Sequence, residues 1–210
     1  MNPVYSFCHH TAAALARAAF DFRVIHPERL LTEGPVLICP NHSSYFDPPL
    51  AGIAWQGVHY LGRHTLYSNP VARWLFPRLQ VVPIDQDRAG FAGLKTIIRL
   101  LKEGKRVMLF PEGARTLDGA LQRGEPGAGL VVSKARAPVQ PLRLFGAWEA
   151  LPPGSGAVKL RKITLVVGEP LRFDREVLLE GKEGYQAISD RIMAAIAALH
   201  CPPDRIPEPR

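Results

Sequence analysis

Short apolar runs alternate along the chain with segments whose apolar residues recur at helical spacing. Runs of strand length and composition predict strands at 23–26, 36–39, 58–61, 81–84, 106–110, 138–145 and 158–167. Helical periodicity and helix stop signals predict helices at 4–22, 48–55, 65–76, 88–103, 125–136 and 185–199. Strands that alternate with helices are typical of an α/β fold with a largely parallel central sheet flanked by helices. We therefore expect one α/β domain of this kind.

The same patterns divide the chain into three parts. Residues 1–22 are expected to form an N-terminal amphipathic helix, whose apolar stripe consists of Val4, Phe7, Cys8, Thr11, Leu15, Ala19 and Phe22. Residues 23–200 form the domain that carries the chemistry, and its length allows a full core. Residues 201–210 hold four prolines and are expected to be a loose tail.

A histidine and an aspartate lie five residues apart directly after the apolar run 36–39. His42 is expected at the C-terminal end of that strand, and Asp47 at the start of the next helix, with two prolines in its first turn. A carboxylate in that place can hold one imidazole nitrogen and leave the other free to take a proton. We interpret His42 and Asp47 as a general base and its orienting partner.

A second polar stretch follows the apolar run 106–110. Within it, Gly113 lets a ligand or another backbone come close, and Arg115 is a planar donor suited to phosphate. Because one strand end carries a base and another carries an arginine, the sequence predicts a single crevice at the carboxyl edge of the sheet.

Together these stretches resemble the motifs of the glycerolipid acyltransferase family, which has a phospholipid/glycerol acyltransferase domain. The family's first motif is Asn-His, four variable residues and Asp, and it is matched by Asn41, His42 and Asp47. Its third motif is Phe-Pro-Glu-Gly, one residue, Arg and Ser or Thr, and it is matched by Phe110, Pro111, Glu112, Gly113, Arg115 and Thr116. Its fourth motif, an apolar strand with spaced prolines, fits residues 137–141. The resemblance covers roughly residues 20–170.

The family's second motif, which is associated with the acceptor's phosphate, departs from the pattern here. Arg63 can stand where the family usually has a lysine. Gln86 occupies the usual arginine position, and Arg88 lies two residues further on. This departure bears on the identity of the acceptor and leaves the chemistry as it is.

The resemblance implies an O-acyltransferase of phospholipid biosynthesis. Its donor would be acyl-CoA or acyl-carrier protein, and its acceptor the free hydroxyl of a lyso-glycerophospholipid, most specifically 1-acyl-sn-glycerol-3-phosphate. His42 and Asp47 would be catalytic, and the substrate-binding residues would be Arg63, Arg88, Glu112, Gly113, Arg115 and Thr116. Glu112 would accept a hydrogen bond from a glycerol hydroxyl or hold Arg115 in place. Backbone N–H groups at the strand-to-helix turn are candidate oxyanion donors. No cofactor and no metal are expected, because thioester transfer needs none.

Other functions remain open at this point. The acceptor can be another lyso-lipid, such as lyso-ornithine lipid, because of Gln86. The fold can serve a non-catalytic lipid-binding protein, or a hydrolase in which His42 activates water on thioesters. A serine acyl-enzyme at Ser43 or Ser44 is a further mechanism, disfavoured because no Gly-x-Ser-x-Gly elbow is present.

The chain is basic, with 26 Lys and Arg against 19 Asp and Glu. Such a surface suits nucleic acid, an anionic bilayer or an anionic substrate. No nucleic-acid-binding motif occurs, so we expect an anionic membrane surface as partner and no nucleic acid.

No run approaches the ~18 apolar residues of a membrane span. The three scattered cysteines form neither a disulfide framework nor a zinc site, and no secretory signal is evident. We therefore expect a cytoplasmic protein peripherally associated with the inner face of the membrane, with the helix 4–22 either touching lipid or packing on its own domain.

Overall fold

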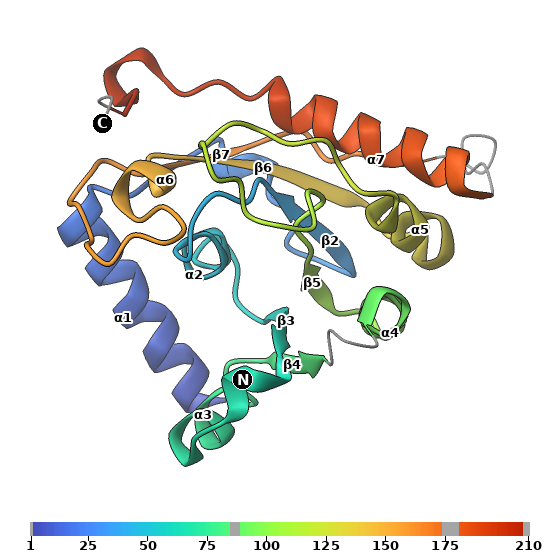
Figure 1. Ribbon diagram of the computed structural model, residues 1–210, viewed down its shortest axis with the longest axis horizontal. Coiled ribbons are helices and arrows are strands. Elements are labelled where there is room, and N and C mark those ends of the chain that lie inside the picture. Colours follow the sequence, from blue (N-terminus) through green and yellow to red (C-terminus); the bar gives the residue numbers. More distant parts are fainter. Residues whose placement is uncertain (1, 85–88, 174–180, 208–210) are drawn as a thin grey trace.

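A seven-stranded sheet forms the centre of the computed structural model, which describes residues 2–84, 89–173 and 181–207 (Figure 1). The strands are β1 (Arg23–Ile25), β2 (Val36–Pro40), β3 (Val58–Arg63), β4 (Val81–Ile84), β5 (Arg106–Met108), β6 (Val139–Phe145) and β7 (Thr164–Val167). Their spatial order is β1-β7-β6-β2-β5-β3-β4. Neighbouring strands are parallel except for β6 and β7, which are antiparallel. The predicted α/β fold with a largely parallel sheet is confirmed.

Helices cover both faces of this sheet. The α-helices are α1 (Pro3–Phe20), α2 (Asp47–Gly52), α3 (Pro70–Leu75), α4 (Ala89–Lys102), α5 (Pro126–Ala135), α6 (Ala147–Ala150) and α7 (Gly181–Ala197). Short 3-10 helices are η1 (Pro27–Arg29), η2 (His64–Tyr67) and η4 (Pro203–Arg205). Residues of α1 and α2 pack in the core on one face, and residues of α4, α5 and α7 pack on the other (Figure 1).

Strand β2 explains why its sequence is continuously apolar. Val36 and Ile38 belong to the core on the α1–α2 side, whereas Leu37 and Cys39 belong to the core on the α4–α5–α7 side. All four side chains have no exposed surface. Successive side chains of a strand point to opposite faces, so a strand covered on both faces needs apolar residues at every position. The carboxyl end of this buried strand is therefore a rigid support for the residues that follow it.

α1 packs on the domain through a face that differs from the predicted apolar stripe, for which contact with lipid and packing on the domain were both open. The helix buries Tyr5, Ala13 and Ala16, while Phe7 and Leu15 of the stripe are 73% and 62% exposed. The small alanines let the helix lie close to the domain, and the Tyr5 hydroxyl accepts hydrogen bonds from the N–H groups of residues 57 and 58. Among the described residues, no helix is both long enough and apolar enough to cross a bilayer.

In the C-terminal half two further expectations fail and one helix was missed. Strand β7 begins at residue 164, so residues 158–163 of the predicted strand are not part of the sheet, and the short helix α6 was not predicted. The tail is not loose at η4, where Arg205 is 3% exposed. Its guanidinium donates to the Asp21 carboxylate at 2.8 Å and to the Thr164 hydroxyl at 2.9 Å. These long-range bonds hold the tail against the start of β7 and the end of α1.

Candidate active site

The two polar stretches meet at one edge of the sheet because their strands are neighbours. Strands β2 and β5 are parallel, with Ile38 opposite Met108. The chain therefore leaves both strands at the same carboxyl edge. Residues 41–47 follow β2 and lead into α2, and residues 109–116 follow β5. This is the crevice position expected from the sequence.

Asp47 organises the turn after β2. Its carboxylate is fully buried, and Oδ2 lies 2.9 Å from Nδ1 of His42. The same oxygen accepts the backbone N–H groups of Ser43 at 2.5 Å and Ser44 at 2.6 Å. The carboxylate thus fixes the imidazole and the shape of the turn together. Because both N–H groups are engaged by Asp47, they are not the free oxyanion donors that the sequence suggested for this turn.

The imidazole of His42 is held on two sides. The Phe110 ring stacks on it with centroids 3.8 Å apart and planes 19° apart. With Nδ1 bonded to Asp47, Nε2 is the nitrogen that can exchange a proton. The His42 side chain is 18% exposed, so it is shielded but accessible from the cavity that it lines.

Both backbone polar groups of His42 are bonded to the loop after β5. Its N–H donates to Oε1 of Glu112 at 2.6 Å, and its C=O accepts the N–H of Thr116 at 3.0 Å. The other Glu112 oxygen accepts the N–H of Gln122 at 2.9 Å. Burial raises the pKa of the Glu112 carboxyl, although these N–H bonds act in the opposite direction. Glu112, expected at the substrate, therefore has both carboxylate oxygens bonded to backbone N–H groups, one of them that of His42. Thr116, also expected there, supports His42 through its own N–H, while its hydroxyl donates to Asp118 at 2.6 Å.

Gly113 and Asn41 complete the frame of these two loops. Gly113 has φ +73°, and a Cβ there would lie 3.1 Å from the Glu125 side chain, so the tight turn requires glycine. Asn41 bonds both the N–H and the C=O of Leu144 on β6. The Ser44 hydroxyl donates to the carbonyl of Leu151 and not to His42, which gives no support to a serine acyl-enzyme at this residue.

The predicted cationic residues have different surroundings. The guanidinium of Arg115 lies over the exposed ring of Tyr45, with Cζ 3.6 Å from the ring centroid. Arg63 is exposed at the end of β3. Arg88, together with Gln86, lies outside the described residues. Arg115 is therefore the predicted phosphate ligand that the structure places directly beside the turn of His42.

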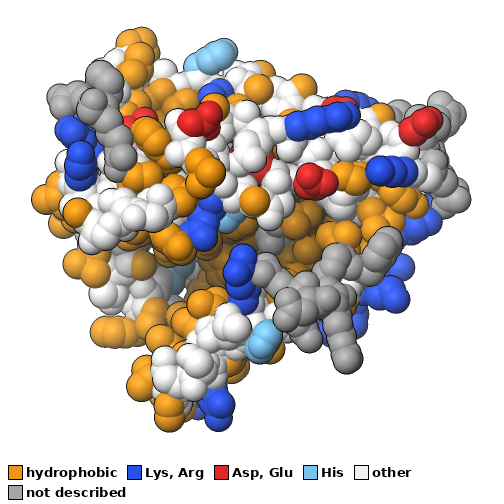
Figure 2. Space-filling view, in the orientation of Figure 1, with side chains coloured by type: hydrophobic (Ala, Val, Ile, Leu, Met, Phe, Trp, Pro, Cys, Tyr) orange, Lys and Arg blue, Asp and Glu red, His pale blue; other side chains and the backbone are white. Residues whose placement is uncertain are grey.

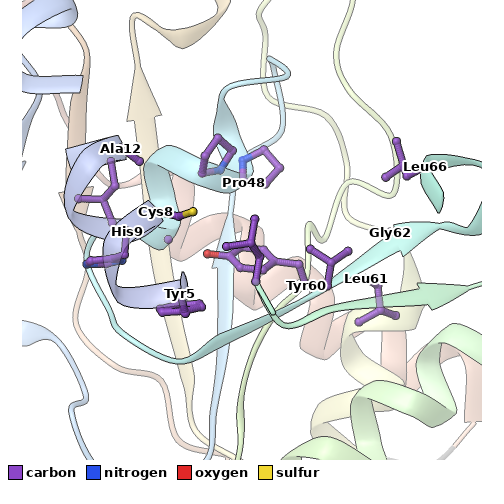
Figure 3. Close-up of a pocket in the computed structure, with 14 residues that line it drawn as sticks. Tyr5, Cys8, His9, Ala12, Pro48, Tyr60, Leu61, Gly62 and Leu66 are labelled. Carbon is purple, nitrogen blue, oxygen red and sulfur yellow. The ribbon is translucent and has the colours of Figure 1, made fainter. Parts of the chain in front are cut away.

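Two apolar cavities meet next to the site. The first has a volume of about 550 Å³ and is lined by His42, Phe110, Met108 and residues of α4 and α5. The second has a volume of about 320 Å³ and lies between α1, α2 and β3, where Tyr5, Cys8 and Tyr60 point into it (Figure 3). Both are lined by Pro48, Tyr60 and Leu61. The space-filling view shows a hollow with hydrophobic walls in the middle of one face of the molecule (Figure 2).

Tyr60 is the main site feature that sequence reasoning missed. It was assigned only to a strand, yet it forms part of the wall between the cavities. Burial raises its pKa, so the phenol is neutral. A Cβ at Gly52 would lie 1.8 Å from its hydroxyl, so the glycine in α2 makes room for it. The Phe110 stack and the Tyr45–Arg115 contact were also missed, although their residues lie in the quoted motifs.

Within 2–84, 89–173 and 181–207, no cluster of three or more His, Cys, Asp or Glu could hold a metal ion.

Comparisons with known proteins agree with this geometry. The chain is 28% identical over 200 residues to the 1-acyl-sn-glycerol-3-phosphate acyltransferase of Bacillus subtilis (strain 168), covering 93% of this chain and 96% of that protein. It is 27% identical over 180 residues to the chloroplastic 1-acyl-sn-glycerol-3-phosphate acyltransferase LPAT1 of Arabidopsis thaliana, covering 81% of this chain and 51% of that one.

A solved structure also shares the fold. The crystal structure of the 1-acyl-sn-glycerophosphate (LPA) acyltransferase PlsC from Thermotoga maritima matches with a TM-score of 0.72 at 23% identity, over 95% of this chain and 80% of that one. The family model described as Acyltransferase matches residues 21–144, which include both polar loops and the strands that carry them. The resemblance found in the sequence is thereby confirmed, and the chain belongs to the Acyltransferase family.

Proposed function

We propose that this protein transfers a fatty acyl group from a thioester donor to the free hydroxyl of 1-acyl-sn-glycerol-3-phosphate. The observation that carries the proposal is the 2.9 Å contact between His42 Nδ1 and Asp47 Oδ2 beside an apolar cavity. Support for the acceptor comes from the Bacillus relative, whose name specifies that lipid and which the chain matches over nearly its whole length. The donor is acyl-CoA or acyl-carrier protein.

In this mechanism His42 acts first as base and then as acid. Nε2 removes the proton of the acceptor hydroxyl while its oxygen attacks the thioester carbonyl, and a tetrahedral oxyanion forms. When the carbon–sulfur bond breaks, the proton passes from Nε2 to the leaving thiolate. Asp47 keeps the tautomer with the proton on Nδ1 and stabilises the imidazolium between the two steps. The products are the diacyl lipid and the free thiol, and no metal or cofactor takes part.

The supporting residues divide into binding and positioning roles. Arg115 and Arg63 are the cationic groups proposed for the acceptor's phosphate, with Arg88 as a third candidate from the sequence. Glu112 and Thr116 hold the backbone of His42, and Gly113 shapes their loop. We therefore assign Glu112 and Thr116 to positioning rather than to substrate contact.

The two apolar cavities suit a reaction in which both substrates carry a fatty chain. The cavity of about 550 Å³ contains His42 and is proposed to hold the acyl chain of the donor near the attacking oxygen. The cavity of about 320 Å³ shares Pro48, Tyr60 and Leu61 with it and is proposed for the chain of the acceptor. Apolar walls with few polar groups are typical of lipid pockets.

We also propose that the protein touches the inner face of an anionic membrane through α1. The exposed side chains of this helix include Phe7 and Leu15, and residues 3–20 contain no acidic residue. Exposed apolar groups without negative charge suit the interface of a bilayer that carries negative headgroups. This favours the lipid-touching option for the helix over one in which its apolar stripe is buried.

A second surface with the same character lies on η2 and α3. Val71 is 70% exposed, Trp74 is 52% exposed and Leu66 is 49% exposed. No acidic residue occurs from 48 to 84, and Arg73 is exposed beside these side chains. Co-sedimentation with phosphatidylglycerol vesicles should fall for a Val71→Ser/Trp74→Ser variant that unfolds like the wild type. Unchanged sedimentation of that variant would remove α3 from the proposed contact.

Labelled acyl transfer by the purified chain tests the enzymatic proposal. Acyl-CoA and acyl-carrier protein serve as donors against a panel of lyso-lipids, with His42→Ala and the exposed His200→Ala as variant and control. Transfer to 1-acyl-sn-glycerol-3-phosphate that is lost only in His42→Ala supports the proposal. Transfer to another lyso-lipid alone would show that the acceptor is a different lyso-lipid, the alternative that Gln86 suggests. Release of fatty acid at one rate with or without acceptor would make the protein a hydrolase.

A further inference from the structure

Tyr45 occupies an unusual place for an aromatic side chain. It lies inside the turn that joins His42 to Asp47, and the residue is 57% exposed. A large apolar group that is left exposed in a catalytic turn contributes little to the core. The ring contacts Arg115, whose Cζ lies 3.6 Å from the ring centroid.

The backbones on both sides of the contact are fixed. The turn that carries Tyr45 is pinned by the N–H of Ser44 on Asp47, and the residue after Arg115 is pinned by the N–H of Thr116 on the carbonyl of His42. The ring and the guanidinium are therefore brought together by two rigid loops. The contact is built into the site and does not depend on a long flexible segment.

The chemistry of the contact leaves Arg115 ready for an anion. A guanidinium that stacks on a ring uses its face, while its N–H donors lie in the plane and point outward. Among the described residues, no carboxylate lies within ion-pair distance of Arg115. The nearby Asp118 carboxylate accepts from the Thr116 hydroxyl at 2.6 Å and from the N–H of Ala120 at 3.0 Å. Arg115 is thus oriented without being neutralised.

We propose that Tyr45 is a positioning residue for the acceptor's phosphomonoester. The aromatic ring holds the Arg115 guanidinium in one orientation, so that its in-plane donors are prearranged for two phosphate oxygens. The inference rests on the proposed function, because it assigns Arg115 to the acceptor's phosphate. It requires the ring and not the phenol hydroxyl.

Steady-state kinetics of the full-length chain, with each substrate varied in turn, test this role. Tyr45→Leu is expected to raise the KM for 1-acyl-sn-glycerol-3-phosphate by about three- to tenfold and to leave the KM for the thioester donor unchanged. Tyr45→Phe keeps the ring and is expected to restore the wild-type KM. Phe173→Leu removes a ring from another arginine contact, that of Arg191, and serves as the matched control.

A double-mutant cycle with Arg115→Met makes the test specific. If Tyr45 acts through Arg115, Tyr45→Leu has no further effect on the acceptor KM once the guanidinium is gone. An unchanged acceptor KM in Tyr45→Leu would overturn the inference and leave the proposed function intact. An equal increase in the acceptor KM in Tyr45→Phe would overturn the inference and would indicate a direct contact between the Tyr45 hydroxyl and the substrate. Equal increases in the KM of both substrates would indicate general damage to the site and would also overturn it.

If the wild-type protein acylates no phosphorylated acceptor, the proposed function fails by itself. Equilibrium binding of sn-glycerol 3-phosphate, measured by NMR titration, then decides the inference independently. Binding that weakens about threefold or more in Tyr45→Leu, but not in Tyr45→Phe, supports the positioning role. Equal binding by all variants, or absence of binding to the wild type, overturns it.

Discussion

Replacement of Asp47 by asparagine and by alanine should separate the two roles of its carboxylate. Oδ2 serves the imidazole of His42 and the buried N–H groups of Ser43 and Ser44 at once. An asparagine oxygen in the same place can still accept the N–H groups. The amide NH₂ would then replace Oδ1, which has no hydrogen-bond partner among the described residues, so no existing bond is lost there. Asp47→Asn should therefore preserve the turn and remove the negative charge.

The expected magnitudes follow from this geometry. Loss of the carboxylate that orients the base and stabilises the imidazolium lowers kcat by about 10³- to 10⁴-fold, which is about 4–5.5 kcal/mol. Asp47→Ala should lower kcat as much. It also leaves the buried N–H groups of Ser43 and Ser44 without an acceptor, which costs about 1–3 kcal/mol each, or about 2–6 kcal/mol of unfolding free energy. That is a large share of the ~5–15 kcal/mol typical of a folded domain.

Acyl-transfer kinetics and urea unfolding at pH 7.5 measure the two effects. His42→Ala is the control, because it should remove activity while costing only about 1 kcal/mol of stability from the lost stack on Phe110. A kcat for Asp47→Asn within about tenfold of the wild type would refute the assignment of Asp47 to the base. Equal unfolding free energies for Asp47→Asn and Asp47→Ala would show that the two N–H groups do not depend on the carboxylate.

Three further predictions concern packing and pH. Gly129→Ala places a Cβ 1.8 Å from the Tyr185 carbonyl oxygen, so we expect a loss of about 2–3 kcal/mol in urea unfolding, whereas Gly127→Ala meets only a side chain and should be nearly neutral. Burial lowers the pKa of His59, so below about pH 6.5 the unfolded chain binds a proton more readily than the folded protein does. The unfolding free energy therefore decreases as the pH is lowered. Between pH 7.5 and pH 5.5 this decrease should be smaller in His59→Gln than in the wild type. Arg205→Met should lower the unfolding free energy by about 1–3 kcal/mol, because the buried Thr164 hydroxyl loses its donor, whereas the Asp21 carboxylate is 47% exposed and can be hydrated. An unchanged urea midpoint would mean that the tail contributes nothing to stability.

Local patterns were sufficient for most of the fold. Strand β2 was recognisable because a strand covered on both faces must be apolar throughout, and Gly104 marked the end of α4 because its φ of +78° is easy only for glycine. The face of α1 was not predictable in this way. Large side chains such as Phe7 dominate a helical stripe, whereas the actual packing uses Ala13 and Ala16, whose small size allows a close approach.

The site was predictable in its chemistry and less so in its connections. The spacing of His42 and Asp47 indicated a base and its partner, since that relation is local. The bonds from Glu112 to the backbone of His42 join residues 70 positions apart, and they depend on which strands become neighbours. No local pattern distinguishes a glutamate that binds substrate from one that accepts a backbone N–H. Tyr60 was missed for the same reason, because its role depends on two helices meeting β3.

The double attachment of His42 to the loop after β5 has a consequence for building hybrid enzymes. Its N–H and its C=O are each bonded to that loop, through Glu112 and Thr116. A hybrid that took segment 41–47 from one relative and segment 110–116 from another would join a base to a support shaped for a different partner. The two segments should therefore be transplanted together, although 62 residues separate them in the sequence. Donor or acceptor preference can then be exchanged by swapping the residues that line the cavities, while these two segments are kept from one protein.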